Sequence, residues 1–384
     1  MHIAVDALLV YGEFSGVQHA ILHQLRALLG LDAGHRYTVV ALQDVPIEEH
    51  LGETRQPYAV LRAPVCSGER LKRLLWQQAA LPNALARIEA DLLYSPGYLT
   101  SLCWRGPSVV FVHDTIALSH PHLCKFSNAF NYRLLLPPSA RHATLVATPS
   151  HASARDVADF CRVPAGRMRV APLGVRMPSL PTEEDCRDAL ACRQLAAPYL
   201  LAVSTIEPKK NFDSLIRWFT AWKKQGIPHH LVIIGKPGWG MEPVQEALAA
   251  SPYRECIHLL GYVPQEELPP LMAAADLLLM PSRYEGFGLP VLEAMALGVP
   301  VVASDQGALP ETVNGAGLIL PLRDDRWQAE IPALLGQPEQ LAAMRRAGLA
   351  WAGAHTWQRT AERLLEVFEE AAGGNVQQGN LISL

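Results

Sequence analysis

Short β-rich runs alternate with amphipathic helical stretches along the first part of the chain, and the same alternation recurs in the second part. Each run is rich in Val, Ile or Leu and ends at Gly, Pro, Asp or Ser, as strands do. Alternation of this kind predicts βαβ units and parallel sheets, so we expect an α/β protein made of two doubly wound domains. The expected strands are His2–Leu8, Tyr37–Leu42, Asp91–Ser95, Ser108–His113, Leu145–Pro149 and Met168–Pro172, then Tyr199–Ser204, His230–Ile234, Ile257–Tyr262, Asp276–Pro281, Pro300–Ala303 and Leu318–Pro321.

The boundary between the two domains is expected in the segment Gly174–Asp185. It contains Pro178 and Pro181 and ends in Thr182-Glu183-Glu184-Asp185, which is typical of a helix start. We therefore expect one domain over residues 1–175, a second over residues 176–372 and a polar tail over residues 373–384. Two facing domains of this class would place a ligand cleft between the carboxyl ends of both sheets.

Composition excludes several classes of protein. The net charge of −4 argues against a nucleic-acid partner, because such proteins carry a basic surplus. No apolar run approaches the roughly 18 residues needed to cross a bilayer, and the first residues show no secretory signal. The 7 cysteines are scattered and lack a Cys-x-x-Cys pair, which disfavours a disulfide framework or a structural zinc site. These features together favour a cytoplasmic protein with reduced thiols.

The most informative segment runs from Pro281 to Pro300, where an apolar strand is followed by a turn and a helix. Gly286 and Gly288 allow the backbone to approach a ligand, and Pro290 suits the first turn of a helix. A helix N-terminus attracts phosphate and other oxygen-rich anions. Two glycines alone would equally fit a structural turn. Glu285 and Glu293 add two carboxylates suited to binding hydroxyl groups, so we interpret the segment as a ligand site.

The segment from Glu285 to Ser304 resembles the signature of the family-4 retaining glycosyltransferases, which have the GT-B fold of two facing Rossmann-like domains. The Glu-x7-Glu element of that signature is Glu285 and Glu293 here. The resemblance covers almost the whole chain. Further stretches similar to family motifs are Glu13–Val17, His113-Asp114, Ala171–Val175, Val203–Asn211, Ile234–Gly240 and Gly261–Pro264.

The resemblance implies roles for individual residues. It implies that Lys210 faces a departing diphosphate, with Lys209 beside it, and that Glu293 binds the ribose hydroxyls. Glu285 and the backbone from Gly286 to Leu289 would hold the sugar and the diphosphate. Glu285 would also support the transition state. The resulting expected catalytic residues are His113, Lys210 and Glu285, and the expected donor-binding residues are Gly16, Lys209, Gly286, Phe287, Gly288, Leu289 and Glu293.

The implied activity is retaining transfer of a hexose, with mannose favoured, from a nucleotide-diphosphate sugar. The implied acceptor is a saccharide or a lipid-linked saccharide of polysaccharide assembly, and GDP-mannose is the favoured donor. The family often has a Gly-Arg pair before the lysine, where this chain has Ser204-Thr205. Lys209 is the candidate for that missing cation. No metal is expected, because the close acidic pair Asp324-Asp325 is typical of an exposed helix start.

Two alternatives stay open from the residues alone. One is a nucleotide-sugar 2-epimerase-like enzyme, and the other is a non-catalytic nucleotide-sugar-binding protein of the same fold. A nicotinamide dehydrogenase is disfavoured, because Glu13-Phe14-Ser15-Gly16 replaces the Gly-x-Gly-x-x-Gly motif.

Membrane contact is a separate question. In the segment from Glu69 to Trp76, Leu71, Leu74 and Leu75 share one helical face, which fits either a peripheral membrane helix or a helix that packs its leucines on the sheet.

Overall fold

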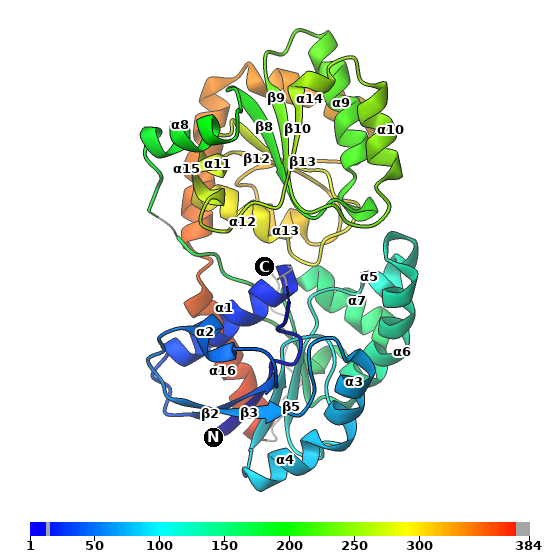
Figure 1. Cartoon of the computed structure of the whole chain (residues 1–384), viewed down its shortest axis with the longest axis vertical. Coiled ribbons are helices and arrows are strands. Elements are labelled where there is room, and N and C mark those ends of the chain that lie inside the picture. The colour runs from blue at the N-terminus through cyan, green and yellow to red at the C-terminus, as the bar shows by residue number, and fades with distance from the viewer. Residues whose placement is uncertain (13–15, 178, 374–384) are drawn as a thin grey trace. The chain divides into compact units, whose positions relative to one another are not determined.

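Two compact units make up the computed structural model, which describes residues 1–12, 16–177 and 179–373 (Figure 1). The first unit comprises Met1–Pro121, Phe126–Gly174 and the segment from Trp357 on, and the second comprises His122–Lys125 and Val175–Thr356. The expected contribution of Glu13, Phe14 and Ser15 to the first glycine loop lies outside the described residues, as does the expected polar tail beyond Gly373.

The first unit is built on a parallel sheet of 7 strands in the order β3-β2-β1-β4-β5-β6-β7. The strands are β1 (His2–Asp6), β2 (Arg36–Leu42), β3 (Tyr58–Ala63), β4 (Leu92–Ser95), β5 (Ser108–Phe111), β6 (Leu145–Thr148) and β7 (Met168–Val170). Six of them were expected from the sequence, and β3 was missed. β3 is an edge strand whose residues are mostly only partly buried, so it lacks the continuous apolar run of a central strand.

Helices cover both faces of this sheet. Leu93 and Tyr94 are neighbours in β4 and point to opposite faces. The Tyr94 ring lies 4.8 Å from that of Phe368 in α16, and its hydroxyl donates to Gln24 of α1, whereas Leu93 packs with Leu81 and Leu85 of α4. The helices of the unit are α1 (Gly16–Gly30), α2 (Ile47–Leu51), α3 (Arg70–Ala79), α4 (Leu81–Arg87), α5 (Ile116–Ser119), α6 (Phe126–His142), α7 (His151–Cys161) and α16 (Trp357–Gly373).

The C-terminal helix α16 groups with the first unit, although the expected second domain ran to residue 372. Its apolar stripe, which includes Leu364, Val367 and Phe368, is fully buried against α1 and the strands β4, β5 and β6. Arg169 in β7 also forms an ion pair with Glu370 of α16. The chain therefore returns to its first unit because the sheet there needs a cover for one apolar face, which local sequence patterns do not reveal.

The second unit has a parallel sheet of 6 strands in the order β10-β9-β8-β11-β12-β13. The strands are β8 (Tyr199–Val203), β9 (His230–Ile234), β10 (Ile257–Gly261), β11 (Leu277–Met280), β12 (Val301–Ser304) and β13 (Leu318–Leu320). The helices are α8 (Glu183–Cys192), α9 (Phe212–Lys224), α10 (Glu242–Ala250), α11 (Leu268–Ala273), α12 (Leu289–Ala296), α13 (Leu309–Val313), α14 (Asp324–Leu335) and α15 (Pro338–Gly353). All six expected strands are present, as are the helix start at Thr182, which forms a capping box with Asp185, and the one at Asp324.

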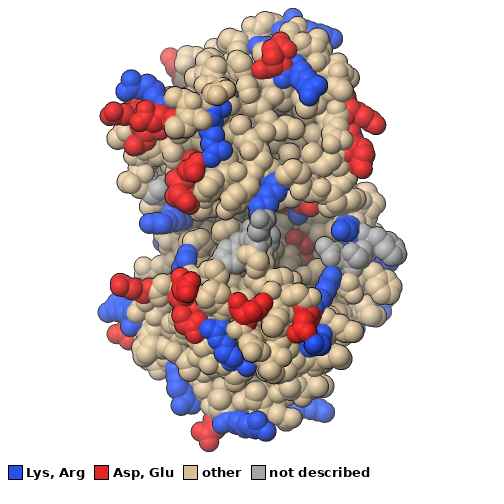
Figure 2. All heavy atoms as spheres, viewed as in Figure 1, with Lys and Arg blue, Asp and Glu red and all other residues tan. Residues whose placement is uncertain are grey.

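An aromatic cluster forms much of the core on one face of this sheet. The rings of Trp218 and Trp327 stack with centroids 4.8 Å apart, and Trp222 donates to the carbonyl of Trp327 at 3.2 Å. This packing ties α9 to α14 and fixes the strand-to-helix turn that precedes α9. The surface carries both signs of charge, interspersed over the visible face (Figure 2).

Candidate functional site

The order of strands reverses between β8 and β11 in the second unit. Ligands of doubly wound sheets bind at the carboxyl ends of the strands beside such a reversal. Lys209 and Lys210 follow β8 in the short 3-10 helix Pro208–Lys210, and Glu285 follows β11. The two segments that carry the expected site residues are thus neighbours in space, although they are far apart in the sequence.

Lys210 and Glu285 form a buried ion pair. The Lys210 Nζ donates to the Glu285 Oε1 at 2.6 Å, and each side chain is 9% exposed. The hydroxyl of Ser282 donates to the same oxygen at 2.7 Å. Burial raises the pKa of Glu285, but the charges of Lys210 and Lys209 and these two hydrogen bonds outweigh it, so the pKa lies below its usual value. Burial also lowers the pKa of Lys210, and Lys209 adds to that effect against the attraction of Glu285.

Two glycines shape the loop around Glu285. Gly288 has φ +101° and caps the start of α12, and Gly307 has φ +59°. A Cβ on Gly307 would lie 2.3 Å from the carbonyl oxygen of Glu285, so no side chain fits there. The backbone N–H of Ala308 donates to the same carbonyl at 2.9 Å. The backbone around Glu285 is thus held by its neighbours, and its position depends little on the carboxylate itself.

α12 begins at Leu289, four residues after Glu285. Pro290 has no N–H and the Val291 N–H donates to the carbonyl of Gly288 at 3.0 Å, so the backbone donor that this first turn offers to an anion is the Leu289 N–H. Gly286 and Phe287 are buried in the preceding turn, and Thr312 donates to the carbonyl of Phe287. One helical turn further on, burial raises the pKa of Glu293 to about 7. No hydrogen bond or ion pair to the Glu293 carboxylate is found within residues 1–12, 16–177 and 179–373, and the residue is only partly buried, so its carboxylate is accessible to a ligand.

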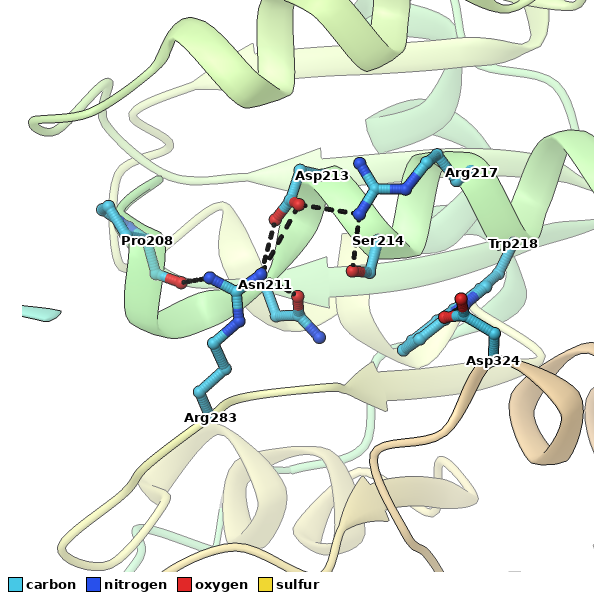
Figure 3. Close-up of polar contacts among 8 residues, drawn as sticks. All are labelled: Pro208, Asn211, Asp213, Ser214, Arg217, Trp218, Arg283 and Asp324. Carbon is cyan, nitrogen blue, oxygen red and sulfur yellow. Dashed lines mark hydrogen bonds and ion pairs between the residues drawn. The ribbon is translucent and has the colours of Figure 1, made fainter. Parts of the chain in front are cut away.

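Arg283 links the two loops of the site (Figure 3). Its guanidinium donates to the carbonyl of Pro208 at 3.1 Å and to the Asn211 side chain at 2.7 Å, and lies 3.4 Å from Asp213. Its backbone N–H donates to the carbonyl of Lys209 at 2.7 Å. Arg283 therefore contacts the turn on both sides of Lys210 and holds that turn against the loop that carries Glu285.

Replacing Arg283 with alanine is expected to lower the free energy of unfolding by about 1–3 kcal/mol, because the Asn211, Pro208 and Asp213 oxygens lose charge-assisted hydrogen bonds. Urea unfolding of the full chain measures this. Arg217→Ala is the matched control, since Arg217 also contacts Asp213 but its side chain is 56% exposed, and we expect a change below about 1 kcal/mol. Equal losses in the two variants would show that Arg283 does not hold the turn.

The first unit holds the remaining expected residues. His113 follows β5, is 6% exposed, and its Nε2 lies 2.8 Å from the carbonyl of Pro96. Burial lowers the pKa of His113 to about 4, so the imidazole is neutral near pH 7, with Nε2 protonated and Nδ1 able to accept a proton or hydrogen bond. Gly16 is the first residue of α1. His113 thus suits contact with hydroxyl groups rather than with an anion.

Sequence reasoning missed three residues of the second unit's site. Ser282 and Arg283 lie close to Glu285 within the segment from Pro281 to Pro300. No spacing rule identifies a hydroxyl that binds Glu285 or a guanidinium that binds a neighbouring loop. Gly307 lies far along the chain, and its need for a positive φ is not visible in a single sequence. Asp324, by contrast, is a helix start as expected, and it accepts a hydrogen bond from the Trp218 indole at 2.7 Å (Figure 3).

Two searches of the described residues were negative. They contain no group of three or more His, Cys, Asp or Glu side chains arranged to hold a metal ion. Nor do they contain a helix that is both long and apolar enough to cross a bilayer.

Comparison with known families matches both units. Residues 14–177 match the model described as Glycosyltransferase Family 4, and residues 193–351 match the model described as Glycosyl transferases group 1. Together the two models cover the greater part of both units.

Curated relatives agree with these matches, and a solved structure shares the fold. The Escherichia coli O-antigen chain mannosyltransferase B is 33% identical over 61% of this chain and 62% of its own length. The chain spans less than two thirds of the length of the first curated relatives that it matches. The GDP-mannose-dependent alpha-(1-6)-phosphatidylinositol monomannoside mannosyltransferase of Mycolicibacterium smegmatis is 29% identical over 94% of this chain and 97% of its own length. The Anabaena protein HepE, solved with UDP-glucose, aligns with a TM-score of 0.75 at 20% identity over 96% of this chain and 100% of its own.

Proposed function

Because this chain belongs to the family-4 glycosyltransferases of GT-B fold, we propose that it transfers a mannosyl group, with retention of configuration, from GDP-mannose to a saccharide or lipid-linked saccharide acceptor. The observation that carries the proposal is the buried Lys210–Glu285 pair at the strand reversal of the second unit, beside the start of α12.

The reaction assigns a task to each of these groups. As the bond between C1 of the sugar and the diphosphate oxygen breaks, negative charge grows on the diphosphate and the sugar gains oxocarbenium character. Lys210 and the Leu289 N–H at the start of α12 stabilise that negative charge. Glu285 holds Lys210 in place and supports the sugar, and Lys209 supplies the second cation. The acceptor hydroxyl attacks C1 from the face that the diphosphate leaves, and its proton leaves with the diphosphate.

The identity of the donor is proposed from the relatives and from the residues. Both curated relatives described above are named mannosyltransferases, and one name specifies GDP-mannose. The solved neighbour binds UDP-glucose, but at 20% identity it supports the fold alone. Glu293, with its unpaired carboxylate, is the proposed ligand of the ribose hydroxyls for either base. The names of the relatives do not favour the epimerase-like alternative.

A thermal-shift screen of the full chain against GDP, UDP, ADP and dTDP, each with and without EDTA, tests the proposed donor. A nucleotide that binds only the folded state raises the melting temperature as its concentration rises. We expect the largest shift with GDP and the same shift in EDTA, because the proposed charge stabilisation uses lysines and a helix N-terminus. No shift with any nucleotide would favour the non-catalytic alternative, and loss of the GDP shift in EDTA would refute the metal-independent site.

We further propose that the protein works at the surface of an anionic membrane, which the first unit contacts through α3 and α6. Leu71 and Leu75 of α3 are 71% and 60% exposed, and Phe130 and Leu134 of α6 are 61% and 64% exposed. Leu74 of the same expected face is half-buried and lines a pocket of the first unit. Leu71 and Leu75 would be buried if they packed on the sheet, so their exposure favours membrane contact through these two leucines. Arg70 is exposed one residue before Leu71 and suits anionic headgroups.

Replacing both Leu71 and Leu75 with serine is expected to weaken binding to vesicles that contain phosphatidylglycerol by tenfold or more, because each exposed leucine contributes about 1–2 kcal/mol on insertion. Vesicle co-sedimentation measures the partition. The exposed Leu180 of the second unit, replaced by serine, is the control and should leave binding unchanged. Equal partition of wild type and double variant would contradict the membrane surface.

A further inference from the structure

A pocket lies at the strand reversal of the first unit, where the sheet order changes between β1 and β4. Its lining includes Asp6 at the end of β1, Gly97 after β4, Arg70 and Arg73 of α3 and Tyr132 of α6. Its cavity volume is about 40 Å³, which suits a small anion and excludes a large ligand. The reversal of a doubly wound sheet is where ligands bind, so the place of this pocket is not incidental.

Arg73 is a buried cation without a matching partner. Its side chain belongs to a residue that is only 7% exposed, and its Nη1 is buried and makes no hydrogen bond. The contact found for the guanidinium is with the ring of Tyr11, whose centroid lies 4.9 Å away. Within the described part of the chain, no carboxylate forms an ion pair with Arg73. A buried charge without hydrogen bonds is costly, and native proteins rarely keep one unless it serves a ligand.

Asp6 is not a hydrogen-bonded partner of the Arg73 guanidinium. Its carboxylate is already engaged by the Gln77 amide and by the backbone N–H of Leu8 at 3.1 Å. Burial raises the pKa of Asp6 and these bonds oppose the rise, as does the charge of Arg73. Asp6 therefore offsets part of the Arg73 charge through space, but leaves its N–H donors unused. With Arg70 at the rim, the pocket has two arginines against one carboxylate.

The other walls also suit an oxyanion. Asn131 and Tyr132 of α6 line the pocket, and burial raises the pKa of Tyr132, so its hydroxyl stays a hydrogen-bond donor. The pocket is also close to His113, because the Tyr132 ring lies 5.1 Å from that of Tyr98, which lies 5.4 Å from that of His113. An anion held here would thus lie near the histidine expected to contact an acceptor hydroxyl.

We propose that this pocket, the Arg73 pocket, is an oxyanion site that holds a phosphate group of the acceptor. A guanidinium fork with free N–H groups matches the oxygens of a phosphate, and a buried arginine binds a phosphate more strongly than an exposed one. Phosphate binding in the pocket follows from its own side chains. The assignment of that phosphate to an acceptor rests on the proposed transferase function.

Inorganic phosphate and pyrophosphate are the probes, added to the full chain at constant ionic strength in the presence of saturating GDP. GDP occupies the nucleotide site of the second unit, so the remaining shift reports the Arg73 pocket. We expect both anions to raise the melting temperature of the wild type, and Arg73→Gln to lower the affinity at least tenfold. The GDP shift should be the same in Arg73→Gln as in the wild type, which separates this site from the donor site.

Lys72→Gln is the matched control. It removes the same charge from the neighbouring position of α3, but the Lys72 side chain is 70% exposed and ion-paired with Glu69. We expect an unchanged phosphate response. Without phosphate, Arg73→Gln should be about as stable as the wild type, because removal of a buried charge without hydrogen bonds offsets the loss of the charge that opposes the raised pKa of Asp6. Marked destabilisation of Arg73→Gln would show a structural role and count against the proposal.

Three results would overturn the Arg73 pocket. The first is a wild type that does not respond to phosphate or pyrophosphate. The second is a wild-type response in Arg73→Gln or, if that variant does not fold, in Arg73→Lys, which keeps the charge but loses the fork. The third is a response only to vesicles containing phosphatidylglycerol, lost in Arg73→Gln, which would assign the arginine to membrane headgroups. Failure of the GDP shift with a normal phosphate response would instead count against the transferase function and leave the pocket standing.

Discussion

Lys210→Ala is expected to lower turnover by about 10²–10³-fold while weakening nucleotide-sugar binding much less. The diphosphate carries more negative charge in the transition state than in the bound donor, so a cation aimed at it acts mainly on the rate. Steady-state kinetics with GDP-mannose measures the effect, with kcat and the donor affinity compared separately. Equal losses in kcat and in affinity would contradict the role of Lys210 in stabilising the leaving group.

The same variant is expected to be less stable by about 3–5 kcal/mol, because it leaves Glu285 buried and unpaired. The double variant Lys210→Met with Glu285→Gln removes both charges and is the control. It should recover most of the stability and none of the activity. A double variant as unstable as the single one would show that the destabilisation arises from packing and that the ion pair has no part in it.

Glu293→Gln is expected to weaken nucleotide binding by about tenfold to a hundredfold, because the ribose hydroxyls lose a carboxylate that can accept from both. The loss should be seen in the donor affinity, with kcat at saturating donor nearly unchanged. Isothermal titration with GDP measures it. An affinity equal to that of the wild type would remove Glu293 from the ribose site.

Glu293 should also make the stability of the ligand-free protein depend on pH. Burial raises the pKa of Glu293 from 4.5 to about 7, so between these values the folded state binds more protons than the unfolded state. Stability is therefore complete below about pH 4.5 and falls by about 3 kcal/mol as the pH rises to about 7. Glu293→Gln should remove this slope and be more stable than the wild type at pH 8. Parallel pH profiles for the two proteins would show that the carboxylate is not strained.

The affinity for nucleotide should rise with pH over the range in which the stability of the free protein falls. The ionised carboxylate accepts hydroxyl protons, so GDP affinity is expected to rise as Glu293 ionises around pH 7. The phosphate groups of GDP also titrate near this pH. In Glu293→Gln the pH dependence of GDP affinity comes from the phosphate groups and no longer from Glu293, so this variant serves as the reference.

The fold was largely predictable from the sequence because parallel strands buried on both faces are continuous apolar runs. β8, β9 and β11 are of this kind, and each lies where it was expected. β3 was missed because it is an edge strand with partly exposed residues. The residues of α16 were assigned to the second domain, because the place of this helix on the first sheet depends on an apolar face of β4 to β6 that no local pattern records.

The sequence predicted the members of the candidate site better than the contacts among them. Glu285 and Glu293 were found by their spacing and by the helix start between them, and Lys210 by its resemblance to a family motif. That Lys210 and Glu285 touch follows from the order of β8 and β11 in the sheet, which spacing does not reveal. The contacts of Arg283 are with a neighbouring loop, and Arg73 is buried without a hydrogen-bond partner among the described residues. Only the tertiary structure shows either fact.

The most direct test of the account is the release of GDP from GDP-mannose by the full chain, with and without a mannose-terminated oligosaccharide, compared with UDP-glucose under the same conditions. The account predicts release from GDP-mannose that the acceptor accelerates and that Lys210→Ala reduces by about 10²–10³-fold. Release from GDP-mannose by the wild type no faster than by Lys210→Ala, or faster release from UDP-glucose, would contradict it.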